Sequence, residues 1–148
     1  MEFIFDIITY IVIGFFALIA LLVVITVVIT VVFGKRIEKE YDLEAEFHDE
    51  KGKEFAEFDL SSWRYQKEGG EYQFKASFKW RDSRLALDSK VEVLLENQIV
   101  LQGTVEKVGN IRLNNQHIVN QPENPQAGQQ CQIRLDGEVV LEKALAED

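Results

Sequence analysis

The stretch from Ile7 to Gly34 reads IITYIVIGFFALIALLVVITVVITVVFG and contains no charged residue. About 20 apolar residues are enough for a helix to cross the hydrocarbon core of a bilayer. The run therefore predicts a transmembrane helix over residues 7–34, preceded by a short segment, residues 1–6. A secretory signal peptide would place Lys or Arg before a shorter run, whereas only acidic charges precede this one. A buried helix of a soluble protein would need more surrounding chain than remains here.

Basic residues lie on one side of the run only. Lys35, Arg36 and Lys39 follow it closely, and none precedes it. Because basic residues are retained in the cytoplasm during insertion, we expect a single-pass protein of the cell (inner) membrane with its N-terminus outside and its C-terminal domain in the cytoplasm. The single Cys131 agrees with a reducing compartment without deciding it. A domain on the other side is the alternative, since small domains can override the rule.

The apolar run is also longer than a bilayer requires. At 1.5 Å per residue it extends about 42 Å, against about 30 Å of hydrocarbon, and a usual tilt does not absorb the difference. We therefore expect another protein to cover part of the helix. Small residues let helices approach closely. They lie on two nearly opposite sides of this helix, Thr9, Ala20, Thr30 and Gly34 on one and Gly14 and Ala17 on the other. The alternative is a lipid-facing anchor with small residues scattered by chance.

The 148-residue chain is acidic, with 16 Lys and Arg against 25 Asp and Glu and a net charge of -9. Nucleic-acid binding depends on basic residues that neutralise phosphates, so we expect no nucleic acid among the partners. The chain that follows the apolar run is long enough for one small water-facing domain.

That domain, residues 41–148 after a charged stem at 35–40, is predicted to be all β. Residues 41–47 and 72–80 alternate apolar and polar side chains with period two, as strands with one buried face do. The pair Asp136-Gly137 is suited to a two-residue hairpin turn. Seven to nine short strands separated by turns predict an antiparallel β-sandwich or a small barrel. Helix is expected only in the membrane.

Residues 114–130 form the long irregular segment of this domain. They contain both prolines of the chain, Pro122 and Pro125, as well as His117 and many Asn and Gln residues. Long irregular loops in small domains are usually functional or mobile. We therefore consider two interpretations, a partner-contacting loop and a flexible excursion.

The sequence contains no motif for catalysis, cofactor binding or metal binding. His48 and His117 lie outside any HxH, HExxH or Cys/His grouping, and no GxSxG, GxGxxG or P-loop pattern occurs. We interpret His48-Asp49-Glu50 as a solvated turn. The chain is therefore expected not to be an enzyme and to need no cofactor or metal.

Aromatic residues offer the remaining candidate contacts. Those at period two from Tyr72 to Trp80 are expected to pack in the core. Trp63-Arg64-Tyr65 lies in a turn-rich stretch and is the exception. The residues that could contact a partner or ligand are therefore Trp63, Arg64, Tyr65, His117, Pro122 and Pro125.

These features lead to one functional expectation and one alternative. The expectation is a non-catalytic, single-pass accessory or structural subunit of a larger integral membrane complex, with the lipid bilayer and integral membrane proteins as its partners. Several accessory subunits of bacterial energy-converting complexes share this plan, although no motif here points to a named family. The alternative is a membrane-tethered β-sandwich that binds a ligand.

Overall fold

The structure is a computed structural model that describes residues 1–33, 37–65 and 70–148. The chain divides into a helical unit, Met1–Arg36, and a β unit, Ile37–Asp148. Three residues to which the sequence assigned roles, Gly34, Lys35 and Arg36, lie outside the described residues.

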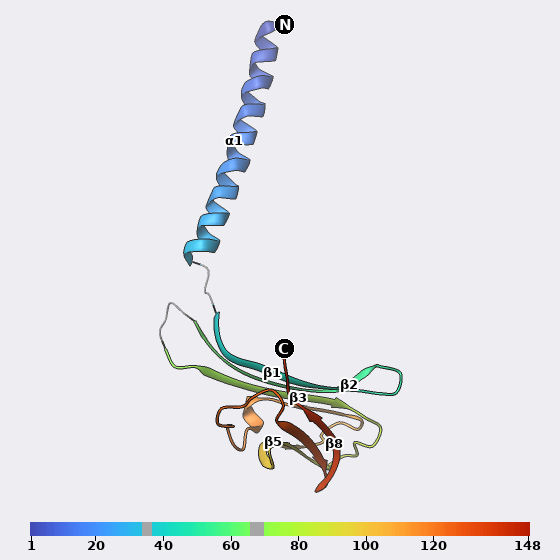
Figure 1. The fold of residues 1–148 in the computed structure, drawn as a ribbon. Helices are drawn as coiled ribbons and strands as arrows, with labels where there is room; N and C mark the ends of the chain where they lie inside the picture. The colour runs from blue at the N-terminus through green and yellow to red at the C-terminus, as the bar shows by residue number, and fades with distance from the viewer. Residues whose placement is uncertain (34–36, 66–69) are drawn as a thin grey trace. The chain divides into compact units, whose positions relative to one another are not determined.

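The helical unit contains one α-helix, α1 (Glu2–Phe33), of 32 residues (Figure 1). It begins before the apolar run, so most of the expected separate segment at 1–6 is helical. Residues 1–6 contain no Gly or Pro that would interrupt a helix. Glu2, an acidic residue in the first turn, interacts favourably with the helix dipole.

The part of α1 from Glu2 to Val31 is a candidate membrane span. A window of 18 residues within it has a mean hydropathy of 3.2, and none of that window is buried by the residues that the structure describes. These properties indicate association with a membrane. A signal sequence near an N-terminus can have the same length and composition.

The β unit contains two antiparallel sheets, one of five strands in the order β6-β3-β2-β1-β9 and one of four in the order β5-β4-β7-β8 (Figure 1). The predicted helix followed by an antiparallel sandwich is confirmed. The alternative of a small barrel is wrong, because the described strands form two separate sheets. The elements are β1 (Ile37–His48), β2 (Glu54–Tyr65), β3 (Gln73–Arg81), β4 (Lys90–Leu95), β5 (Gln98–Thr104), β6 (Asn110–Leu113), the 3-10 helix η1 (Asn115–His117), β7 (Gln130–Leu135), β8 (Glu138–Ala144) and β9 (Ala146–Glu147).

Both sheets contribute to one core. Phe58 and Phe78 come from the five-stranded sheet, and Val93 and Ile133 from the four-stranded sheet, and all four are buried. The alternation in β2 and β3 places these side chains on one face. The opposite face of the five-stranded sheet is therefore left for polar residues.

Strand β1 begins inside the segment expected to be a charged stem. Ile37 pairs with Tyr65 and Lys39 with Trp63 in the β1–β2 ladder. The acids and bases of this segment do not prevent pairing, because the Glu38 carboxylate accepts a hydrogen bond from the Arg64 guanidinium across the two strands. Pairing with β2 thus extends β1 toward the helical unit in the sequence.

Hydrogen bonds attach the start of the 114–130 segment to the sandwich. The Asn115 side chain accepts from the amide of Ala76 and donates to the carbonyl of Phe74, both in β3. The Val119 amide donates to the Val100 carbonyl at the edge of β5. The segment therefore covers the edge of β5, which would otherwise be open for pairing with another chain. The short 3-10 helix η1 lies in the β unit, so the prediction that helix occurs only in the membrane is wrong.

Candidate functional site: an acidic sheet face

The outer face of the five-stranded sheet is rich in carboxylates. In β1, Leu43, Ala45 and Phe47 point into the core, so the residues between them point outward. The strand register places Glu44 opposite Asp59 and Glu46 opposite Glu57. We call this surface the acidic face and define it by five residues: Glu44, Glu46, Glu54, Glu57 and Asp59.

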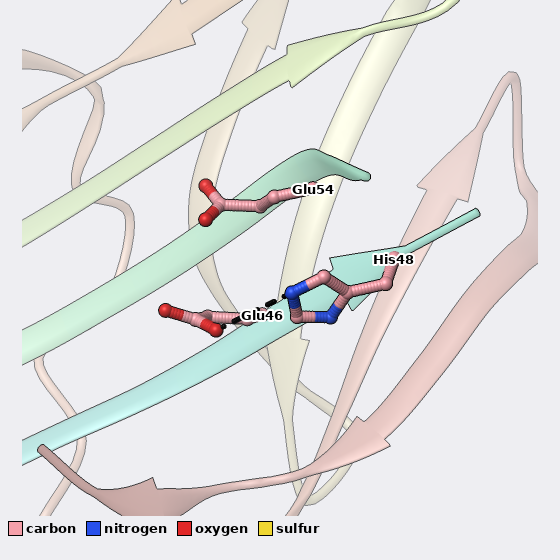
Figure 2. Close-up of side chains that lie close together, drawn as sticks. All are labelled: Glu46, His48 and Glu54. Atoms are coloured by element: carbon pink, nitrogen blue, oxygen red, sulfur yellow. Dashed lines mark ion pairs between the residues drawn. The ribbon is translucent and has the colours of Figure 1, made fainter. Parts of the chain in front are cut away.

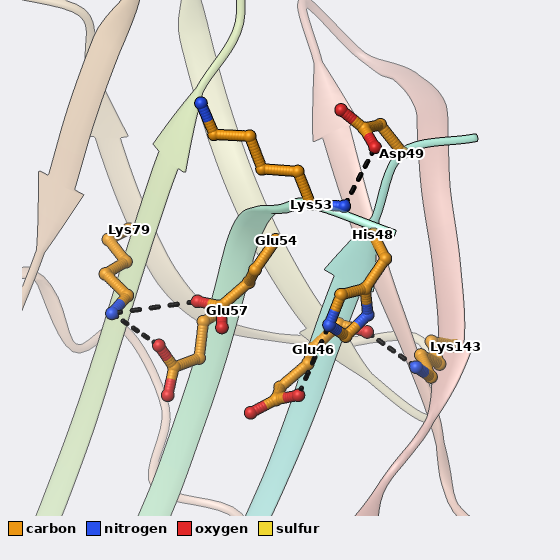
Figure 3. Close-up of polar contacts among 8 residues, drawn as sticks. All are labelled: Glu46, His48, Asp49, Lys53, Glu54, Glu57, Lys79 and Lys143. Atoms are coloured by element: carbon orange, nitrogen blue, oxygen red, sulfur yellow. Dashed lines mark hydrogen bonds and ion pairs between the residues drawn. The ribbon is translucent and has the colours of Figure 1, made fainter. Parts of the chain in front are cut away.

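Lys79 of β3 is a cation within this surface. Its Nζ lies 2.5 Å from Oε2 of Glu57 and 3.7 Å from Oε1 of Glu54 (Figure 3). Glu57 is the cross-strand partner of Lys79. One ammonium group therefore contacts two carboxylates, and its contact with Glu57 is the closer of the two.

Burial and like charge divide the carboxylates into two classes. The Lys79 ammonium holds the pKa of Glu57 below its ordinary value, because the hydrogen bond favours the ionised form. Burial, followed by the negative charge of Glu57, raises the pKa of Asp59 to about 6. Burial also raises the pKa values of Glu44 and Glu54, with neighbouring carboxylates adding to the effect. Glu44, Glu54 and Asp59 of the acidic face therefore ionise at a higher pH than ordinary carboxyl groups do.

Two groups of side chains on this surface bring metal-ligating atoms within 4.8 Å of one another. One consists of Glu44, Glu57 and Asp59. The other consists of Glu46, His48 and Glu54, at the end of the β1–β2 hairpin (Figure 2). His48 is the last residue of β1, so its predicted place in a solvated turn is wrong, and the sequence did not predict that it lies beside Glu46 and Glu54. The available signal was the spacing of Glu46 and His48, two residues apart on one strand.

At the other end of the hairpin, Trp63, Arg64 and Tyr65 are the last residues of β2, so their predicted place in a turn-rich stretch is wrong. The guanidinium carbon of Arg64 lies 4.6 Å from the centre of the Tyr72 ring, and its Nε donates to Glu38 over 2.8 Å. The rings of Trp63 and Tyr65 meet edge to face with centres 5.2 Å apart. Contacts within the β unit therefore hold all three residues of the Trp63-Arg64-Tyr65 stretch.

The structure brings Trp63 together with the start of the 114–130 segment. A cavity of about 340 Å³ is lined by residues of β3, by Trp63 and by residues 114–116. His117 lines a different cavity beside Gly103, and its Nδ1 accepts a hydrogen bond from the Asn114 amide.

The two prolines that the sequence suggested as contacts have a different position. Pro122 and Pro125 are both buried in the β unit. Their burial gives them a packing role within the domain.

The small residues proposed for helix packing are exposed in the described part of α1, and they are Thr9, Gly14, Ala17, Ala20 and Thr30. The Thr9 and Thr30 hydroxyls donate to carbonyls four residues earlier in the helix. A Cβ atom added at Gly14 would have no neighbour within 4 Å. No contact among the described residues therefore requires a small residue at position 14. Lys39, the described member of the three basic residues, forms an ion pair with Asp42.

Cys131 is fully buried in β7, and burial raises the pKa of its thiol to about 12. A thiol is a nucleophile and a metal ligand as the thiolate. Cys131 therefore acts as a core residue.

In comparisons with protein families, curated proteins and solved structures, no family model, protein or structure matches this chain.

Proposed function

We propose that this chain is a non-catalytic, single-pass accessory subunit of a larger integral membrane complex. The observation that carries the proposal is the helix α1, whose candidate span is exposed among the residues that the structure describes. Its 32 residues extend about 48 Å, well beyond the about 30 Å of a hydrocarbon core. Neighbouring membrane proteins would cover the apolar surface that lipid does not reach.

The β-sandwich would cap or bridge that complex. Its acidic face offers a charged surface to basic segments of a neighbour, and opposite charge at an interface favours both orientation and fast association. This role needs no catalytic group and agrees with the burial of Cys131.

We further propose that the protein lies in the inner membrane of a bacterium, with the N-terminus outside and the β unit in the cytoplasm. The support is the sequence, in which Lys35, Arg36 and Lys39 follow the apolar run of residues 7–34 and the only charged residues that precede it are acidic. A reporter enzyme that works only in the cytoplasm should be active when it is fused after Asp148. An exported reporter would contradict this orientation.

Photo-crosslinking from the helix tests the subunit proposal. A crosslinking residue at position 14 or 20 should capture an integral membrane protein from one of the two helix sides. Replacement of Gly14 and Ala17 together by Leu should then loosen the assembly if their side is the interface, and replacement of Ala20 should act on the other side. Crosslinks to lipid alone from every helix position would reject the proposal.

The second candidate is a membrane-tethered ligand-binding module. The observation in its favour is the cavity of about 340 Å³ beside Trp63, since ligand pockets typically measure about 300 to 1,000 Å³. Binding of the full chain in nanodiscs to a glycan array tests this second function. Binding that is lost in Trp63→Ala, while the variant keeps its thermal unfolding midpoint, would favour this function.

A further inference from the structure

The group of Glu46, His48 and Glu54 has a regular origin in the β1–β2 hairpin. Glu46 and His48 are two residues apart on β1, so they share one face of the strand. Glu54 is the cross-strand partner of His48 at the start of β2. The hairpin thus presents three donors from adjacent strands to one point (Figure 2).

The distances between the donors suit one metal ion. Zinc binds His nitrogen at about 2.0–2.1 Å and carboxylate oxygen at about 2.0–2.2 Å in a tetrahedral arrangement, which places neighbouring ligand atoms about 3.3 Å apart. Nε2 of His48 lies 3.6 Å from Oε2 of Glu46. All three donors lie within 4.8 Å of one another, and rotation of the exposed Glu54 side chain can shorten its distances.

The surrounding contacts hold the strands that carry these donors. The Asp49 side chain accepts from the amides of Lys51 and Lys53 and so closes the turn between β1 and β2. The Lys143 ammonium on β8 donates to the backbone carbonyl of Glu46 over 2.6 Å (Figure 3). This hydrogen bond uses the backbone of Glu46, so Lys143 does not occupy its carboxylate oxygens.

Lys79 would compete with a metal ion for the carboxylate of Glu54. Lys79 also contacts Glu57, so it does not depend on Glu54 for an ion pair. It lies 3.7 Å from Glu54 but 2.5 Å from Glu57. If Glu54 turns toward a metal ion, Lys79 keeps its closer partner.

The second group on the acidic face, Glu44, Glu57 and Asp59, has oxygen donors only, and its Glu57 already binds Lys79. A ligand set that combines imidazole with carboxylates is selective for transition metals, whereas oxygen ligands alone suit Mg²⁺ and Ca²⁺. The group that contains His48 is therefore the stronger candidate.

We propose that Glu46, His48 and Glu54 bind a divalent transition-metal ion of the zinc class at the turn end of the β1–β2 hairpin. The site supplies three protein ligands and leaves a fourth position for water or for a side chain of a partner. A metal at this point would tie β1 to β2 at the edge of the acidic face.

Titration of the full chain in nanodiscs of neutral lipid with ZnCl₂ by calorimetry at pH 7.5 tests the proposal. We expect one Zn²⁺ per chain. His48→Ala and Glu54→Gln should each weaken the binding by about 10-fold or more, since even residues that only support metal ligands cost 10- to 100-fold when mutated. The matched controls are His117→Ala and Asp59→Asn, which should change the affinity by less than about 2-fold.

A second measurement excludes misfolding as the cause. The chain contains two histidines, so in His117→Ala the imidazole resonances belong to His48. These resonances should shift on addition of Zn²⁺ and not on addition of Mg²⁺, which prefers oxygen ligands. Absence of saturable Zn²⁺ binding by the unmodified chain, unaltered affinity in His48→Ala, or equal loss of affinity in the two controls would overturn the proposal.

Discussion

Asp59 keeps its proton at a pH at which an ordinary aspartate is ionised, because its folded pKa is about 6 against an ordinary value of 3.8. Burial disfavours its charged form, and Glu57 and Glu44 add negative charge nearby. Glu57 is ionised first because Lys79 donates to it. The burial of Asp59 and the contact between Lys79 and Glu57 together make Glu57 ionise at a lower pH than Asp59.

The pH dependence of stability follows from this difference. Between pH 4 and 6 the folded chain binds the Asp59 proton more strongly than the unfolded chain does. The resulting stabilisation is fully present below about pH 4 and is lost as the pH rises through about 6. Because solvent screens this half-buried group, Asp59→Asn should be more stable than the unmodified chain at pH 7.5 by about 1 to 2 kcal/mol, with little difference at pH 4. Urea unfolding followed by the fluorescence of buried Trp80 measures this.

The control for that measurement is Glu123→Gln, which removes an exposed carboxyl from another part of the β unit. It should leave the pH profile of the unmodified chain in place. Parallel profiles for Asp59→Asn and the unmodified chain would show that Asp59 titrates in the same way in the folded and unfolded states.

Asn115 acts as a substitute for a strand partner. Its amide group accepts from the Ala76 amide over 2.9 Å and donates to the Phe74 carbonyl over 3.1 Å. Asn115→Ala removes both bonds, and we expect it to lower the free energy of unfolding by about 1 to 2 kcal/mol. The neighbouring Gln116→Ala removes an exposed side chain and should change it by less than about 0.5 kcal/mol. Equal effects in denaturant titrations of the two variants would contradict this role.

At the scale of elements, β5 and β6 approach each other closely at Gly103. A Cβ atom added there would lie 2.4 Å from Cδ2 of Leu113, a buried residue of β6. Either Leu113 or the strand must therefore move when position 103 carries a side chain. Glycine at this position permits the approach of the two strands.

Gly103→Ala should destabilise the β unit by about 1 to 3 kcal/mol because it overpacks this contact. Leu113→Ala alone should also be destabilising, through loss of core packing. The double variant should lose less free energy of unfolding than the sum of the losses in the two single variants, since alanine at position 113 makes room for the new methyl group. Additive effects in thermal unfolding would mean that the strands adjust without strain.

Period-two alternation was enough to predict the central part of several strands, but it did not predict that β1 begins at Ile37 or that β9 forms. The alternation over 72–80 corresponds to β3, and the turn at Asp136-Gly137 has positive φ at both residues, +50° and +88°. The residues of the candidate metal site could not be grouped in this way. Their proximity depends on the register of β1 against β2, which shifts between Phe47 and His48. Composition and spacing predict the alternation on each strand, but they do not predict that Glu54 lies opposite His48.

The burial of Pro122 and Pro125 was also beyond prediction from the sequence. Proline in an irregular polar segment usually indicates an exposed loop. Here the start of the segment binds β3 and β5 through contacts with residues far away in the sequence. Such long-range contacts override local composition.

At the scale of the whole molecule, the helix is either retained as a membrane anchor or removed as a signal sequence, and the two cases give proteins of different mass. If the helix is retained, intact mass analysis of the protein from its native membrane should include residues 1–33 within a chain of 17.1 kDa. Sodium carbonate washing should leave it in the membrane fraction, because an inserted helix is not held by charge. A mature protein that begins near Ile37 would contradict a permanent anchor.

A role as a subunit of a membrane complex requires that α1 packs against other membrane proteins. Extraction of the native membrane in a mild detergent, followed by native mass spectrometry of the tagged full chain, measures this directly. We predict a complex in which the chain is accompanied by at least one integral membrane protein, and its loss when the small residues on one side of α1 are replaced by Leu. Recovery of the chain only as a free 17.1 kDa monomer, under conditions that preserve other membrane complexes, would contradict the account.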